Sequence, residues 1–306
     1  MKLIPLFLLV GIIAVSGCGK KSLTFSPELV SKAEAGDAKA QGDLGACYYE
    51  GKGVTKDYKE AAKWFIKSAD QGNAGAEYGL GMCYFCGEGV TKDYKESVKW
   101  FTKSADQGNS SAKLGLGACY RDGKGVTQDY KEMVKWFTKS AEQENAEAQC
   151  YLGLAYREGK GVTQDHKEAL KWFKKSAEQG YWYAQYWVGA CYRDGKGVTQ
   201  DYKEAAKWFE KSEQGYPSAR SSVGLCYYQV GVCYRDGKGV TQDYKEAAKW
   251  FRKAAEKGDA FGQRELGLCY ETGKGVGKDQ KEAEKWLTIA KPGLPRITRR
   301  LVPTEH

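Results

Sequence analysis

The chain has 306 residues, of which 42% are hydrophobic and six are proline, and its formal net charge is +9. Scarce proline with abundant alanine, lysine and glutamate is typical of an all-helical chain. The positive charge is spread along the chain, which excludes a concentrated basic arm. This distribution indicates a solvated basic face and leaves open an attraction to an acidic partner or an anionic surface.

Residues 1–18 have the features of an export signal. Lys2 precedes an apolar run from Leu3 to Val15, and the small residues that follow lead to Cys18. This segment resembles a bacterial lipoprotein signal peptide, which implies that Cys18 becomes the lipidated N-terminus. A non-lipidated secretory signal and an N-terminal membrane helix are the alternatives, although the run is shorter than the ~20 residues that a spanning helix needs.

The lipoprotein resemblance also predicts a location. Gly19 follows the cysteine, and the absence of an aspartate there implies the outer membrane, facing the periplasm, if the source is Gram-negative. Residues 19–26 are then a short tether. An exported lipoprotein is not expected to bind nucleic acid.

The segment Gly51–Glu60, GKGVTKDYKE, returns along the chain with intervals of 36, 36, 36, 36, 42 and 36 residues. A motif repeated at nearly fixed spacing predicts an array of stacked structural units. Its seven copies of the GVxxDxKE core begin at Gly53, Gly89, Gly125, Gly161, Gly197, Gly239 and Gly275.

Each repeat reads as a pair of helices, called helix A and helix B. In the first copy, helix A covers Ala40–Tyr49 and ends at the glycines of Gly51–Gly53. Asp57 is a good N-cap for helix B, and Glu60 completes a pattern like a capping box. Helix B then runs from Tyr58 to about Gln71.

A glycine recurs inside every helix A, although it costs about 1 kcal/mol relative to alanine there. We expect it to allow close approach of two helix backbones, beside the large tryptophan of helix B, which is Trp64 in the first repeat. The glycines are Gly45, Gly81, Gly117, Gly153, Gly189, Gly224 and Gly267.

The pattern resembles the Sel-one-like repeat (SLR) family, a relative of the tetratricopeptide repeats. In the first repeat the matching residues are Leu44, Gly45, Tyr48, Gly51, Gly53, Val54, Asp57, Lys59, Ala61, Ala62 and Trp64. The resemblance implies a right-handed α-solenoid of seven helix-turn-helix repeats over residues 27–291, including an N-terminal capping helix at Pro27–Gly36. Residues 292–306 form a basic tail that is either disordered or docked over the end of the solenoid.

The sixth repeat is irregular. The segment Lys211–Gly215 has lost one residue, and Val223–Gln229 is followed by a near copy of itself at Val230–Asp236. Seven residues are almost two helical turns and shift the helix phase by only ~20°. We therefore expect a lengthened helix A that keeps its buried face through Gln229–Gly231.

The sequence contains ten cysteines. Apart from Cys18, most fall at one position of helix A, where we expect small, buried packing residues. Cys83 and Cys86 are three residues apart, so a local disulfide or metal pair is an alternative there. We expect neither a metal site nor a cofactor, because no histidine accompanies these cysteines at metal-site spacing.

Ser110 and Lys113 match the Ser-x-x-Lys pattern of penicillin-interacting enzymes. The companion motifs of those enzymes are missing, and no nucleophile–base set or pair of convergent carboxylates is evident. We therefore predict no catalytic residue. A β-lactam-binding or cell-wall-fragment-binding protein with weak β-lactamase-like activity is the alternative.

The repeats differ most at Tyr181–Trp187, YWYAQYW, which is more aromatic than the same stretch of any other copy. Trp182 and Tyr186, like Tyr183 and Trp187, are i,i+4 neighbours on helix A. Aromatic side chains are enriched at binding hot spots. These four residues are our candidate partner-binding site, and local repacking between repeats is the alternative.

The sequence as a whole predicts a non-enzymatic interaction scaffold of the bacterial cell envelope. Lipid on Cys18 would hold the chain at the membrane, and a protein or peptide partner would bind in the concave groove that helix A lines in tetratricopeptide-like solenoids.

Overall fold

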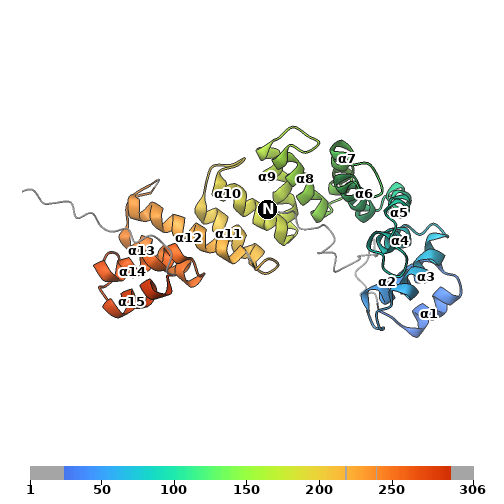
Figure 1. Cartoon of the computed structure of the whole chain (residues 1–306), viewed down its shortest axis with the longest axis horizontal. Helices are drawn as coiled ribbons and strands as arrows, with labels where there is room; N and C mark the ends of the chain where they lie inside the picture. The colour runs from blue at the N-terminus through green and yellow to red at the C-terminus, as the bar shows by residue number, and fades with distance from the viewer. Residues whose placement is uncertain (1–23, 218, 239, 291–306) are drawn as a thin grey trace, which may run out of the picture. The chain divides into compact units, whose positions relative to one another are not determined.

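The computed structural model describes residues 24–290, apart from residues 218 and 239. The chain divides into two compact units, Met1–Ser176 and Ala177–His306. Every regular element of the described residues is an α-helix, and within each unit the helices follow one another as stacked pairs (Figure 1). The all-helical fold predicted from the sequence is therefore confirmed.

The helices have nearly constant lengths. The first unit contains α1 (Pro27–Glu34), α2 (Ala38–Glu50), α3 (Tyr58–Ala69), α4 (Ala74–Cys86), α5 (Tyr94–Asp106), α6 (Ser110–Asp122), α7 (Tyr130–Ala141), α8 (Ala146–Glu158) and most of α9 (His166–Glu178). The second contains α10 (Trp182–Asp194), α11 (Tyr202–Glu213), α12 (Ala219–Asp236), α13 (Tyr244–Glu256), α14 (Ala260–Thr272) and α15 (Gln280–Ile289). Helix α1 is the predicted capping helix, and from α2 onward the even-numbered helices are helix A and the odd-numbered ones helix B.

Local sequence sets the helix ends. Asp57 begins α3, and its Oδ1 accepts hydrogen bonds from the backbone N–H groups of Lys59 (2.9 Å) and Glu60 (3.1 Å). The side chain of Glu60 turns to Lys63 instead of completing a capping box. Gly51 ends α2 in the left-handed conformation, with φ of 74°, which a residue without Cβ adopts at little cost.

The core of the first six repeats is a phenylalanine of helix B packed on a glycine of helix A, and in the seventh Leu287 takes the place of the phenylalanine. Phe101 is fully buried, and a Cβ built on Gly81 would lie 2.6 Å from its ring. A close approach is confirmed at six of the seven predicted glycines, and the side chain that meets them is the residue after the expected tryptophan. The neighbouring Trp100 is only half-buried and lies under Lys103, whose Nζ is 4.1 Å from the ring centroid.

The sixth helix A is continuous, as predicted. Helix α12 has 18 residues, five more than α10, and runs without a break through Gln229–Gly231. The core glycine predicted for this repeat was wrong, however. Gly231 faces Phe251, whereas the nearest atoms to a Cβ on Gly224 belong to Asp259 and Lys257. The second half of the duplication therefore supplies the glycine that packs on the core phenylalanine, as helix A does in the other repeats.

Two backbone-directed contacts join the helices of the first unit. The hydroxyl of Ser68, at the end of α3, donates to the carbonyl of Ala38 at 2.6 Å, and Ser104 and Ser140 repeat this bond one and two repeats later. In the loop before α5, a Cβ on Gly89 would overlap the carbonyl of Tyr58 in the preceding repeat. The loop between helix A and helix B, which ends one helix and caps the next, thus also contacts the preceding repeat.

The packing role predicted for the cysteines is confirmed for most of them. Within the described residues all nine are free thiols, and Cys86, Cys233 and Cys269 are only half-buried, whereas the other six are buried. Burial raises the pKa of the thiols of Cys83 and Cys119 to about 12, which leaves little reactive thiolate at neutral pH.

Several predictions concern residues outside the described ranges. These are the signal segment 1–18 with Cys18, most of the tether 19–26, and the basic tail 292–306. Across residues 24–290, none of the helices combines the length and the apolar character that a membrane crossing requires.

Candidate functional site

The second unit departs from the capping rule at the start of α10. Asn73, for example, begins α4 with its side chain accepting a hydrogen bond from the N–H of Ala76 at 2.9 Å. Tyr181 occupies that position before α10 and makes no side-chain cap bond. Tyr216 follows the same turn before α12. Losing a cap costs a helix about 1 kcal/mol, so we expect the Tyr181 side chain to stabilise the fold through other contacts.

The turn between α11 and α12 is rebuilt around the missing residue. Ser212 no longer bonds to the preceding helix A, and its hydroxyl donates to Phe209 of its own helix at 2.7 Å. Most of the other turns place a glycine at positive φ with no atom near a built Cβ. A Cβ on Gly215 would instead meet Trp182, with the ring carbon Cδ1 at 2.5 Å. The indole therefore lies directly against this turn.

The result is a continuous set of rings, which we call the aromatic cluster: Tyr181, Trp182, Tyr183, Tyr186, Trp187 and Tyr216. Trp182 stacks on Tyr216, with ring centroids 5.1 Å apart and an interplanar angle of 23°. Tyr186 meets Tyr216 edge-on at 5.3 Å and also packs against the buried ring of Phe209 at 5.2 Å. Such contacts contribute ~0.5–1.5 kcal/mol each beyond area burial.

Burial divides the four predicted binding residues into two pairs. Trp187 is 7% exposed and Tyr183 6%, and their rings pack against each other at 6.0 Å. These two side chains are part of the packing and offer almost no surface. Trp182 and Tyr186 are half-buried, so part of each side chain remains accessible. The candidate binding surface is therefore Trp182 and Tyr186.

Tyr216 completes this surface, and the sequence analysis did not single it out. It is half-buried and contacts both Trp182 and Tyr186, whose rings it joins. The available signal was a tyrosine directly after the turn glycine in two consecutive repeats, at Tyr181 and Tyr216, where the other five repeats have the aspartate or asparagine that caps helix A.

The Ser-x-x-Lys match lies at the start of α6 and is used in the structure for other contacts. The Nζ of Lys113 donates to Gln143 Oε1 at 3.0 Å and to the carbonyl of Gly108 at 3.4 Å. The carbonyl of Ser110 accepts from Ser140 at 2.7 Å. Both residues thus take part in joining α6 to α7.

This geometry defines an all-helical repeat protein with a framework of caps and core glycines and a variable aromatic surface. The Sel1 repeat family model matches residues 38–73, 74–109, 110–145, 146–181, 182–214, 224–259 and 260–291. The chain belongs to the Sel1 repeat family. Residues 215–223, which include Gly215 and Tyr216 and the first five residues of α12, fall outside the matched repeats.

Solved structures of related proteins agree. The protective antigen c5321 of uropathogenic Escherichia coli, which displays an SLR fold, is 36% identical, with a TM-score of 0.60; the match covers 89% of this chain and 64% of that one. A Sel1 repeat protein from Oxalobacter formigenes is 37% identical, with a TM-score of 0.52, over 86% of this chain and 74% of that chain. This chain thus spans slightly less than two thirds of the first protein. No curated protein matches.

Proposed function

We propose that this chain is a non-enzymatic scaffold of the bacterial cell envelope that holds a protein or peptide partner against its A helices. Sel1 repeat proteins generally act as protein–protein interaction scaffolds, and the seven repeats supply the same framework here. The N-terminal segment supports an envelope location, since it resembles a lipoprotein signal ending at Cys18.

One observation carries the binding site: the partly accessible side chains of Trp182 and Tyr186 are joined by Tyr216, and they lie on α10, which has no side-chain cap. Aromatic residues supply large contact areas with few rotatable bonds, and they dominate the energetics of many interfaces. A partner with an apolar or aromatic side chain would cover these rings.

The test is a pull-down from a bacterial envelope fraction with the full chain and with the variants Trp182→Ala and Tyr186→Ala. We expect both variants to lose a partner that the unchanged protein retains, because each removes a partly accessible ring of the proposed surface. Trp208→Ala is the matched control, because Trp208 is a half-buried ring on helix B under Lys211. Equal loss of the partner with Trp208→Ala would contradict the proposed surface.

The envelope location has its own test. We expect the protein to sediment with membranes and Cys18→Ser to release it into the soluble fraction, because the substitution removes the acylated thiol. If both proteins fractionate alike, the lipid-anchor proposal fails.

A further inference from the structure

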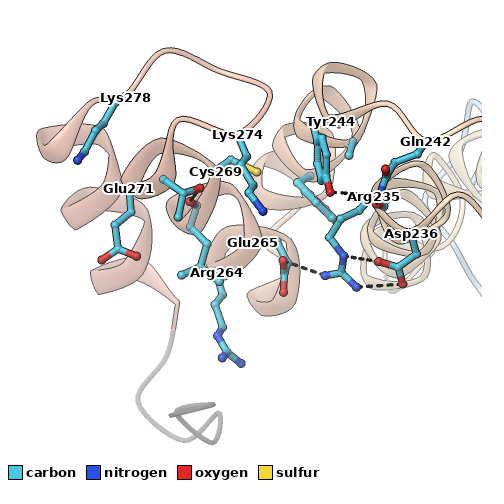
Figure 2. Close-up of a pocket in the computed structure, with 14 residues that line it drawn as sticks. Arg235, Asp236, Gln242, Tyr244, Arg264, Glu265, Cys269, Glu271, Lys274 and Lys278 are labelled. Carbon is cyan, nitrogen blue, oxygen red and sulfur yellow. Dashed lines mark hydrogen bonds and ion pairs between the residues drawn. The ribbon is translucent and has the colours of Figure 1, made fainter. Parts of the chain in front are cut away.

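The second unit contains an open pocket of about 1240 Å³, lined by α12, α13, α14 and the loop that follows α14 (Figure 2). It is separate from the aromatic cluster, since none of its lining residues belongs to that cluster. Pockets of this size are large enough for several side chains of a bound peptide.

One of the helix A positions that line the pocket differs from repeat to repeat: it is Asp43, Gly79, Gly115, Tyr151 and Trp187 in the first five repeats and Glu265 in the last. In α8 that position is Tyr151, whose ring stacks on Phe137 at 5.6 Å. The guanidinium of Arg121 lies over the same ring at 5.3 Å. In α14 the corresponding residue is Glu265, which lines the pocket and pairs with Arg235.

Most of the negative charge in the pocket is already neutralised. Arg235 donates to both oxygens of Asp236, at 2.7 and 3.3 Å, and its Nη1 donates to Glu265 at 3.0 Å. Lys238 lies 3.2 Å from the same aspartate. Figure 2 shows Arg235 held between the two carboxylates. These groups therefore have little capacity left for a cationic ligand.

The remaining charges are mainly positive. Arg264, Lys274 and Lys278 line the pocket, and within the described residues none of them has a hydrogen bond or an ion pair with a carboxylate. Glu271 is the one lining carboxylate in the same situation. Three uncommitted cations against one anion favour a ligand that carries negative charge.

The pocket also offers apolar surface. The ring of Tyr244 is 39% exposed, and Leu268 is half-buried. Lys274 Nζ lies 5.3 Å from the centre of the tyrosine ring, so the charge is next to the apolar wall. A simple inorganic anion would use only the charge, whereas a peptide segment would use both.

We propose that this pocket binds an acidic peptide segment of the partner, with carboxylates at Arg264 and Lys274 and an apolar side chain against Tyr244. This inference rests on the proposed function, because it supplies the charge class of the segment that the scaffold holds. The second unit would then have two contact regions for the partner: the aromatic cluster, which binds apolar groups, and this positively charged pocket.

The test is a fluorescence anisotropy titration of the full chain with three labelled peptides, Glu-Glu-Leu-Glu-Glu, Gln-Gln-Leu-Gln-Gln and Lys-Lys-Leu-Lys-Lys. We expect the acidic peptide to bind most tightly. The double variant Arg264→Gln with Lys274→Gln should weaken this binding by about tenfold, as two charge pairs of up to ~1 kcal/mol each would do. Lys160→Gln with Lys52→Gln is the matched control, because both lysines hold the loop position of Lys274 in other repeats, and it should leave binding unchanged.

Three results would overturn the proposal: equal weakening by the control pair, preference for the basic peptide, or complete displacement of the acidic peptide by an equal concentration of inorganic phosphate. The pull-down keeps this failure distinct from failure of the scaffold function. A partner lost with Trp182→Ala but retained by the Arg264→Gln and Lys274→Gln variant would refute the acidic segment and leave the scaffold function supported. Circular dichroism checks that the double variant folds.

Discussion

The substitution Gly81→Ala tests whether the core glycines are retained for close approach. In an exposed helix, alanine in place of glycine would stabilise the fold by about 1 kcal/mol. Here the added Cβ would lie 2.6 and 2.7 Å from two ring carbons of Phe101, whereas ordinary contacts begin at 3.4 Å. Phe101 is fully buried, so its ring cannot turn away from Gly81 into solvent without losing that burial.

The magnitude follows from these opposing effects. Overpacking of a core costs about 1–3 kcal/mol. An overlap of ~0.7 Å with two atoms of a fixed ring belongs in the upper half of that range. After the propensity gain, we expect a net loss of about 1–2 kcal/mol in the free energy of unfolding.

The same ring supplies the control. Gly115 of α6 faces the other side of Phe101, and a Cβ there would lie 3.1 Å away, an overlap that a small shift relieves. We expect Gly115→Ala to change the free energy of unfolding by less than about 0.5 kcal/mol. Urea denaturation followed by circular dichroism measures both variants. In a protein that already carries Phe101→Leu, the further substitution Gly81→Ala should cost much less stability than it does in the unchanged protein, because the ring that the new Cβ would meet is gone. If Gly81→Ala stabilises the protein as much as Gly115→Ala, the close-approach argument is refuted.

Three further predictions follow from local contacts. Asp129→Ala removes the acceptor for the N–H groups of Lys131 and Glu132, so α7 should lose about 1 kcal/mol, seen as faster amide hydrogen exchange in its first turn; unchanged exchange would contradict the cap. Ser140→Ala should cost about 1 kcal/mol in urea unfolding because it breaks the inter-helix bond to Ser110, whereas Ser212→Ala, whose bond lies within its own helix, should cost less. Burial raises the pKa of Glu147 from 4.5 to about 7, so the folded chain retains a proton that the unfolded chain releases. Stability should therefore fall as pH rises from 4.5 to 7 and level off above pH 7. In Glu147→Gln the urea midpoint should change less with pH across this window. The same pH dependence in the variant as in the unchanged protein would contradict the assignment.

Features determined by neighbouring residues in the sequence were predictable. The caps at Asp57 and its equivalents, the glycine helix ends and the continuous α12 all depend on local chemistry or on helical periodicity, which tertiary contacts here reinforce. The repeat itself supplied the fold class, because seven copies of one pattern restrict the architecture strongly.

The identity of the core side chain and of the core glycine could not be predicted from the periodicity of the sequence. Trp100 and Phe101 are adjacent on helix B, so both fall on its apolar stripe, and only packing decides which ring enters the core. Gly224 and Gly231 are seven residues apart on one helix face, so either one matched the repeat.

The aromatic cluster was only half predictable for a similar reason. The density of rings in 181–187 was visible, but which of them stay accessible depends on Tyr216, which a shortened turn brings beside them. The one-residue deletion thus changed which rings lie together at the surface, whereas the seven-residue duplication left its helix continuous.

The contact between Gly89 and the carbonyl of Tyr58 has a consequence for how such chains change. Gly125 meets Tyr94 and Gly161 meets Tyr130 in the same way in the first unit, as Gly275 meets Tyr244 in the second. The meeting surface is main chain, so it is the same whichever side chains surround it. Neighbouring modules are therefore interchangeable at these joints, and an ancestor could gain or lose one whole module by recombination without a new joint having to be selected.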